Sequence, residues 1–185
     1  MMDGKTTGNL NKRYKTIVID PPWKQNKTGL RSVRPNQGKK LPYKTLTLEE
    51  IKNFNINKFA DDECLVFLWT IDKYLEDAHK ILREWGFKKH CVFVWNKNTG
   101  VCPFSVQFRN EYCLMGYRGK FKLNKIGVPT HFFAKVREHS RKPDEFYEIV
   151  KEIAATPRID IFSREKREGF DQWGDEISKF VEIPA

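Results

Sequence analysis

The sequence predicts an α/β fold in which helices cover both faces of the sheet. Short apolar runs rich in β-branched residues alternate with patterns of helical periodicity along the chain. The runs are almost continuously apolar, as expected for strands buried on both faces. A polar residue also follows three of the expected strands, at Asp20, Lys97 and Arg164. Because ligands of open α/β sheets bind beyond the carboxyl ends of the strands, these three residues are expected to converge on one site.

The first half of the chain contains two expected strands and two expected helices. Residues 15–19 form a β-branched apolar run that predicts a buried strand, and residues 63–69 predict a second. Residues 47–50 have the capping-box pattern, which predicts a short helix through about residue 53. Asp72 is expected to cap a longer helix that Gly86 ends. The apolar stripe of this helix is Leu75, Ala78, Leu82 and Trp85.

The second half is predicted to contain more strands than helices. Three runs are typical of strands, at residues 87–95, 110–117 and 130–135. Pro143 is expected to open a helix with acids in its first turn, and its stripe is Phe146, Ile149, Val150 and Ile153. Residues 158–162 predict the last strand, and residues 169–180 predict a loop and a short helix.

The length of 185 residues predicts one domain over residues 14–180, between a flexible N-terminal segment (1–13) and a tail (181–185). Without a membrane-length apolar run or a signal-peptide pattern, the protein is expected to be soluble, intracellular and cytoplasmic, with no membrane partner. The four cysteines and four histidines lack the clustering of metal ligands, so no metal is expected.

The net charge of +10 is concentrated in two stretches that read as loops. Residues 21–48 contain seven basic residues and no acid, and residues 120–142 contain seven basic residues and one acid. Basic stretches of this kind are typical of proteins that bind the phosphates of nucleic acids. Loops that only increase solubility are the alternative reading.

The turn Asp20-Pro21-Pro22-Trp23 is the most informative feature of the sequence. Two prolines after a buried strand make the segment stiff and extended, and they prevent it from continuing the sheet. We expect the Asp20 carboxylate and the Pro21 carbonyl to form a pair of acceptors beside the Trp23 ring. Such a pair suits a planar base that carries an amino group. A purely structural turn is the alternative, because Asp-Pro pairs commonly start turns.

These residues, together with motifs along nearly the whole chain, resemble the adenine-N6 methyltransferases of the messenger-RNA-adenosine-methyltransferase-like family. After the turn at Asp20, the resemblance includes residues 41–45 (Leu-Pro-Tyr-Lys-Thr), 65–69, 94–97 (Val-Trp-Asn-Lys), 110–114, 118–119, 139–145 (His-Ser-Arg-Lys-Pro-Asp-Glu), 161–164 and 169–176. The series is specific. The small size of the chain favours a stand-alone microbial or phage member of this family, and such members usually act on DNA.

The resemblance implies a Rossmann-like domain that uses S-adenosyl-L-methionine, with the catalytic motif before the main cofactor-binding strand. It implies that the catalytic residues are Asp20, Pro21, Pro22 and Trp23. The implied cofactor-binding residues are Asp20, Lys97, Phe162, Ser163, Arg164, Asp175 and Glu176. Residues 159–164 lack the Gly-x-Gly turn of many methyltransferases, as family members commonly do. Asp175 stands where the family usually has Asn, and Lys166 where some members place a ribose-contacting His.

Several residues are expected to contact the target base or strand. Trp23 and Tyr43 are expected to stack on the base or line its pocket, and Lys39 and Lys40 belong to the basic stretch beside the turn. Glu76 either reaches the base pocket or is a solvated acid of its helix. Asn110 and Glu111 are further pocket candidates. Residues 139–145 either open a helix or contact cofactor or nucleic acid.

The function expected from this reading is methyl transfer to the N6 amine of adenine in DNA. The same reaction on RNA and a nucleic-acid-binding partner subunit without activity are the alternatives. A cytosine-N4 enzyme usually carries Ser in place of Asp20. The family resemblance alone makes a homodimer, or a heterodimer with a related subunit, plausible.

Overall fold

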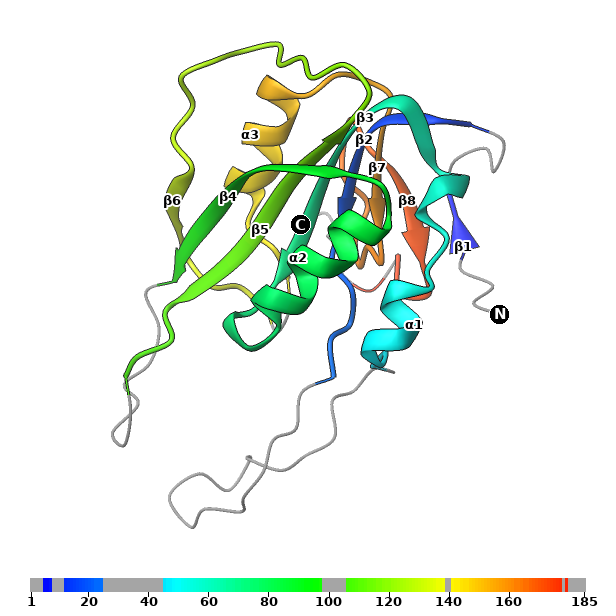
Figure 1. Ribbon diagram of the computed structural model, residues 1–185. Coiled ribbons are helices and arrows are strands. Elements are labelled where there is room, and N and C mark those ends of the chain that lie inside the picture. Colours follow the sequence, from blue (N-terminus) through cyan, green and yellow to red (C-terminus); the bar gives the residue numbers. More distant parts are fainter. Residues whose placement is uncertain are drawn as a thin grey trace.

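The computed structural model describes residues 5–7, 12–24, 45–97, 106–138, 141–177 and 179. These ranges contain one mixed sheet and three α-helices (Figure 1). The strands are β1 (Lys5–Thr6), β2 (Tyr14–Ile19), β3 (Ala60–Thr70), β4 (Lys88–Lys97), β5 (Asn110–Arg118), β6 (His131–Ala134), β7 (Arg158–Ile161) and β8 (Asp171–Gly174). The α-helices are α1 (Leu48–Lys52), α2 (Leu75–Glu84) and α3 (Asp144–Ile153), and two 3-10 turns are η1 (Ile56–Lys58) and η2 (Asp72–Tyr74).

The sheet has the strand order β1-β8-β7-β2-β3-β5-β4-β6. Strand β2 lies between β7 and β3 and is parallel to both, and β8 continues parallel to β7. Strand β5 is antiparallel to both β3 and β4, so β4 and its parallel neighbour β6 run in the same direction as β2. The carboxyl ends of β2, β3, β4 and β7 therefore meet at one edge of the sheet, together with the start of β5.

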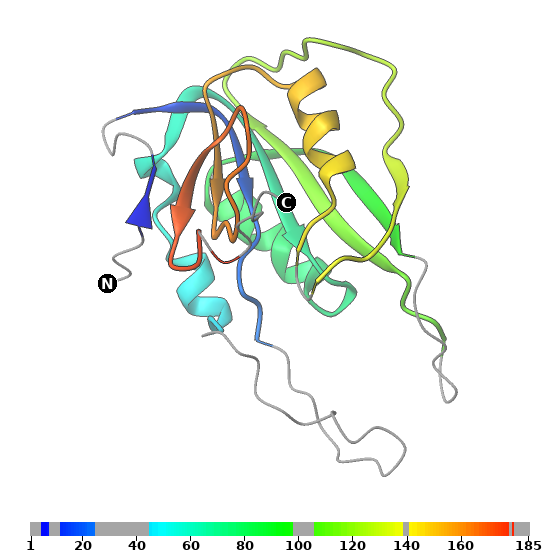
Figure 2. The same ribbon diagram turned by 180° about the vertical axis from the view of Figure 1, so that it is seen from behind.

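Helices cover both faces of the sheet, as the sequence predicts. Helices α1 and α2 pack on one face with a core that includes Ile17, Val66 and Leu82 (Figure 1). Helix α3 lies on the other face, over a core that includes Phe67, Trp69 and Phe146 (Figure 2). The fold class is confirmed: this is the mixed α/β architecture expected of a Rossmann-like methyltransferase. None of the helices in the described part is long and apolar enough to cross a membrane.

The predicted capping box before α1 is present. The Thr47 side chain accepts a hydrogen bond from the Glu50 backbone N–H, and the Glu50 carboxylate accepts one from the Thr47 backbone N–H.

Two local predictions are wrong. Asp72 does not cap α2 but begins the 3-10 turn η2, and Tyr74 occupies the N-cap of α2. Part of the segment read as a loop and short helix is strand β8, whose pairing with β7 comes from tertiary contact rather than local pattern. In the segment before residue 14, Lys5–Thr6 pair with β8.

Asp160 on β7 is a buried acid that ties the sheet to α3. Its Oδ2 accepts a hydrogen bond of 2.9 Å from the Tyr147 hydroxyl. Burial raises the pKa of Asp160 to about 7, against the opposing effect of the Arg167 charge. The folded protein therefore holds a proton on Asp160 that the unfolded chain releases near its ordinary pKa of 3.8.

We expect Asp160→Asn to make stability less dependent on pH. The contribution of Asp160 is fully present below its unfolded pKa and is lost as the pH rises towards about 7. In that window the wild-type free energy of unfolding should fall faster than that of the variant, by at most about 1.4 kcal/mol per pH unit. Urea unfolding at a series of pH values measures both slopes. Identical slopes would show that Asp160 titrates in the folded state as it does in the unfolded one.

Candidate active site

A cavity of about 550 Å³ opens at the edge where the parallel strands end. Its wall is formed by the turn after β2, the segment after β3, the end of β4 and the start of β5. Residues from the segment between β6 and α3 and from the segment after β7 complete it. Its lining residues are Asp20, Pro21, Pro22, Trp23, Ile71, Asp72, Lys73, Lys97, Phe108, Asn110, Glu111, Val136, Lys142 and Arg164. The three polar residues expected to converge, Asp20, Lys97 and Arg164, all line this cavity.

The turn after β2 holds Asp20 at the cavity wall. The Asp20 backbone N–H donates to the Ile161 carbonyl of β7, at 3.3 Å. The Pro21 carbonyl accepts from the Trp23 N–H at 2.8 Å, which closes the turn tightly and leaves this oxygen one further lone pair. The Pro22 carbonyl accepts from the Leu46 N–H at 2.8 Å. The acid is thus fixed by backbone contacts on both sides of the prolines.

A chain of four alternating charges runs through the cavity wall. Lys97 Nζ lies 2.8 Å from Glu111 Oε1, and the other Glu111 oxygen lies 3.4 Å from Lys142 Nζ. Lys142 Nζ then donates to Asp20 Oδ2 at 2.7 Å. Lys142 is buried, and its ammonium also lies 5.3 Å from the centre of the Trp69 ring. Among the described residues, Lys142 is the one hydrogen-bond partner of the Asp20 side chain, which leaves Oδ1 available to a ligand.

Burial and pairing act in opposite directions on these groups. Burial raises the pKa of Asp20 above its ordinary value, although the nearby Lys142 ammonium opposes this change. Burial by itself would lower the pKa of Lys142, but the Asp20 and Glu111 carboxylates outweigh it and raise that pKa. Lys142 therefore stays protonated at neutral pH. Its charge keeps two carboxylates together in a site where they would otherwise repel each other.

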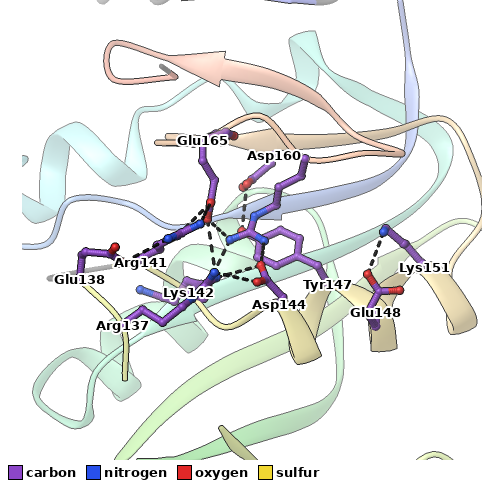
Figure 3. A network of polar contacts seen from close by, with 12 residues as sticks. Arg137, Glu138, Arg141, Lys142, Asp144, Tyr147, Glu148, Lys151, Asp160 and Glu165 are labelled. Atoms are coloured by element: carbon purple, nitrogen blue, oxygen red, sulfur yellow. Dashed lines mark hydrogen bonds and ion pairs between the residues drawn. The ribbon is translucent and has the colours of Figure 1, made fainter. Parts of the chain in front are cut away.

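Lys142 is itself held by two arginines. Arg137 and Arg167 both donate to the Lys142 carbonyl, at 2.6 and 3.1 Å. Both also bind the Asp144 carboxylate at the start of α3, and Arg137 does so through two hydrogen bonds of 2.7 and 2.8 Å. Figure 3 shows Arg137, Asp144 and Glu165 gathered around this corner. The neighbouring Arg137 and the more distant Arg167, after β7, thus fix the backbone that carries Lys142.

The segment after β7 turns sharply behind Asp20. Phe162 has a φ of 61°, a left-handed conformation that favours glycine. Its N–H donates to the Trp173 carbonyl of β8 at 2.7 Å, and the next residue, Ser163, donates its hydroxyl to the Glu165 carbonyl. Backbone strain of this kind is common at ligand sites. A non-glycine residue therefore makes the turn that a Gly-x-Gly motif makes elsewhere.

The expected cofactor residues fall into two groups in space. Lys97 and Arg164 line the cavity, and Phe162, Ser163 and Arg164 line a smaller hollow that Asp20 also borders. Glu176 lies behind Arg164, with Oε2 3.3 Å from Arg164 Nε. Asp175 is exposed and, like Glu176, lines neither hollow. Lys166 is exposed as well.

Of the residues expected to contact the base, some line the cavity, one lies away from it and others are outside the described residues. Trp23 lines the cavity but is buried, with its ring stacked on Tyr74 at 5.2 Å and its Nε1 donating to the Trp69 carbonyl at 2.9 Å. Glu76 does not line the cavity. Its side chain is 83% exposed and pairs with Lys80 on the same helix. Tyr43, Lys39 and Lys40 lie outside the described residues.

Sequence reasoning did not single out several residues of the cavity. Lys142 lies in the His-Ser-Arg-Lys-Pro-Asp-Glu motif, which also reads as an ordinary helix start, so its partner Asp20 could not be inferred. Phe108 and Val136 gave no signal beyond being apolar residues in loops. Ile71, Asp72 and Lys73, which directly follow β3, line the cavity, whereas Glu76 in the following helix does not.

Comparison with known protein families decides the assignment. The family model described as MT-A70 matches residues 14–176, from the start of β2 past the end of β8. The chain belongs to the MT-A70 family. The resemblance expected from the sequence motifs is therefore confirmed, and with it the enzyme class, an adenine-N6 methyltransferase.

The MT-A70 relatives differ in how much of their length they share with this chain. The type II methyltransferase M.MunI of Mycoplasma is 29% identical over 197 residues, which cover 94% of this chain and 82% of that protein. The human N(6)-adenosine-methyltransferase catalytic subunit METTL3 is 28% identical over 162 residues, 82% of this chain and 26% of its own. A probable N(6)-adenosine-methyltransferase of rice is 29% identical and is covered over 21% of its length. This chain thus spans about a quarter or less of the adenosine methyltransferases.

Proposed function

We propose that this protein transfers the methyl group of S-adenosyl-L-methionine to the N6 amine of adenine in DNA. The observation that carries the proposal is the position of Asp20, at the carboxyl end of the central strand and facing a cavity with one carboxylate oxygen available. The cavity volume is in the range of small-molecule sites.

The charges of the cavity fit a cofactor that carries a carboxylate, an ammonium and a sulfonium group. Lys97 and Arg164 are cations suited to the carboxylate and to the ribose oxygens, and Glu111 and Asp20 are acids suited to the positive groups. In this proposal Lys97 holds the carboxylate, Arg164 and Glu176 hold the ribose, and Phe162 and Ser163 form the turn beside it. Asp175 joins the ribose contacts by family resemblance. When bound, the cofactor supplies an electrophilic methyl group.

Asp20 and the Pro21 carbonyl would act on the adenine amine. The lone pair of this amine is delocalised into the ring, which makes it a poor nucleophile. Two acceptors that bind its N–H bonds orient the amine and localise the lone pair. The Asp20 carboxylate also offsets the positive charge that develops on the nitrogen, and Lys142 holds that carboxylate in place. Trp23 and Pro22 shape the wall against which the base lies.

DNA is proposed over RNA because the type II methyltransferase corresponds to this chain over most of both lengths, whereas the adenosine methyltransferases are much longer. The net charge of +10 supports a nucleic acid of either kind as the partner. Pairing with a second subunit is also part of the proposal, because the human relative METTL3 is named as a catalytic subunit.

The test is to incubate the protein with labelled S-adenosyl-L-methionine and four substrates, single- and double-stranded DNA and RNA. We expect labelled N6-methyldeoxyadenosine, identified by nucleoside mass spectrometry. Methylation confined to RNA would overturn the substrate, and N4-methylcytosine would overturn the target atom. No transfer to any substrate, together with no cofactor binding by calorimetry, would leave only the silent partner subunit.

A further inference from the structure

Strand β6 forms one edge of the sheet and carries aromatic and basic side chains on its outward side. Along this strand Phe132 and Ala134 contribute to the core, whereas His131 and Phe133 are exposed, as is Lys135 directly after the strand. Phe133 is 69% exposed, and its ring lies edge-on to that of His131 at 5.8 Å. An exposed ring flanked by basic side chains is suited to a ligand that has an apolar face and negative charge.

A hollow of about 850 Å³, distinct from the smaller hollow beside Asp20, opens beside this strand and is called the second hollow below. Phe133, Arg109 and Lys135 line one side of it, and Asp144, Glu145 and Glu148 of α3 line the other. Asp144 is neutralised by Arg137 and Arg167, and Glu148 pairs with Lys151. Arg109 and Lys135 have no side-chain partner among the described residues. Glu145 has no side-chain partner among the described residues either, so two unpaired cations face one unpaired acid and the free charge beside Phe133 is mainly positive.

The second hollow adjoins the catalytic cavity. Phe108 and Val136 line the catalytic cavity, and the residues next to them in the chain, Arg109 and Lys135, line the second hollow. Two short segments therefore form a shared wall, apolar on the side of Asp20 and basic on the other. Phe108 is 64% exposed at this wall. A strand whose target base enters the cavity would pass over these residues.

We propose that this surface, made of Phe133, Arg109 and Lys135 with Phe108 at the shared wall, binds the nucleotide next to the target adenine. The base stacks on Phe133, and Arg109 and Lys135 contact the phosphates. Bases in a duplex lie about 3.4 Å apart, which leaves no room for a ring between them. The surface therefore takes a strand that is single or locally unstacked. This inference rests on the proposed function and adds the form of its substrate.

A second copy of this chain is the other occupant that an open sheet edge could take. The side chains around Phe133 oppose it, because Lys is depleted in the centres of protein interfaces and charged residues on an edge strand discourage strand pairing. The same rings and cations suit phosphates and bases. The charge complementarity therefore favours a nucleic acid.

The test measures binding without cofactor and without a methylatable base. Fluorescence anisotropy follows a labelled oligothymidylate of about 15 nucleotides and a duplex of G and C of the same length. Phe133→Ala should weaken binding of the single strand about tenfold, and Phe133→Tyr, which keeps the ring, should stay close to wild type. Ile126→Ala is the matched control, because Ile126 is 83% exposed and lines neither hollow.

The salt dependence separates the ring from the cations. Lys135→Gln should reduce the slope of log K against log salt by about 0.7, whereas Phe133→Ala should leave it unchanged. Wild-type binding by Phe133→Ala, equal losses in the Ala and Tyr variants, or an equal loss for the duplex would overturn the inference. A dimer that dissociates in Phe133→Ala, with oligonucleotide binding unchanged, would assign the surface to a second copy.

These outcomes are independent of methyl transfer. A wild-type protein that methylates DNA while Phe133→Ala binds and methylates normally would contradict this inference alone. Conversely, loss of binding in Phe133→Ala, in a protein that methylates nothing, would support the surface and contradict the proposed function.

Discussion

Asp20→Ala should reduce the rate of methyl transfer by about 100-fold or more, because in the proposed mechanism it removes the acceptor that orients the amine and offsets its developing charge. Single-turnover assays with saturating DNA measure this loss directly. Cofactor affinity, measured by calorimetry, should change much less than the rate if Asp20 acts mainly on the amine. Near-full activity in this variant would remove Asp20 from the chemistry.

Asp20→Asn tests the charge with little change of shape. It should lose nearly as much activity, because the amide offers one acceptor and no negative charge. Glu152→Gln is a matched control, since Glu152 pairs with Lys125 on an exposed surface away from the cavity. Thermal unfolding of both variants shows whether a loss of activity reflects a loss of folded protein.

The wild-type pH profile provides an independent measurement of Asp20. Because burial raises its pKa, activity should fall on the acid side at a higher pH than an ordinary aspartate would give. In the proposed mechanism the active form of Asp20 is the carboxylate, so activity is present above this pKa and lost below it.

Lys142→Met should have the second largest effect. It leaves Asp20 and Glu111 as two neighbouring carboxylates without the cation between them. Their mutual repulsion should raise the pKa of Asp20 further and move the acid limb of the pH profile to higher pH. At neutral pH we expect a loss of about tenfold or more in rate, with a destabilisation of about 3–5 kcal/mol from the unpaired buried charge.

The direction of the pH shift distinguishes this role from a purely structural one. Lys142→Arg keeps the positive charge and should restore part of the rate and most of the pH profile. Lys125→Met removes a lysine from an exposed ion pair and should change neither. An acid limb at the same pH in wild type and Lys142→Met would show that Lys142 does not tune Asp20.

Much of the fold could be predicted because its signals are local. The β-branched run of β2, the capping box at Thr47 and the apolar stripe of α3 each identify an element within a short window. Strand β8 could not be predicted in this way. Its four residues carry little strand pattern, and pairing with β7 and β1 determines their conformation.

The candidate site likewise has one part that local sequence patterns predict and another that depends on tertiary contacts. The turn from Asp20 to Trp23 is stiff because of its own prolines, and the ends of parallel strands meet at one edge in any sheet of this class. The sequence by itself therefore determined the α/β class, the outward acid and its meeting with Lys97 and Arg164. Only the tertiary structure decided that Lys142, 122 residues away, binds Asp20. An ion pair depends on the distance between two side chains in space, and the separation of the residues along the chain does not predict that distance.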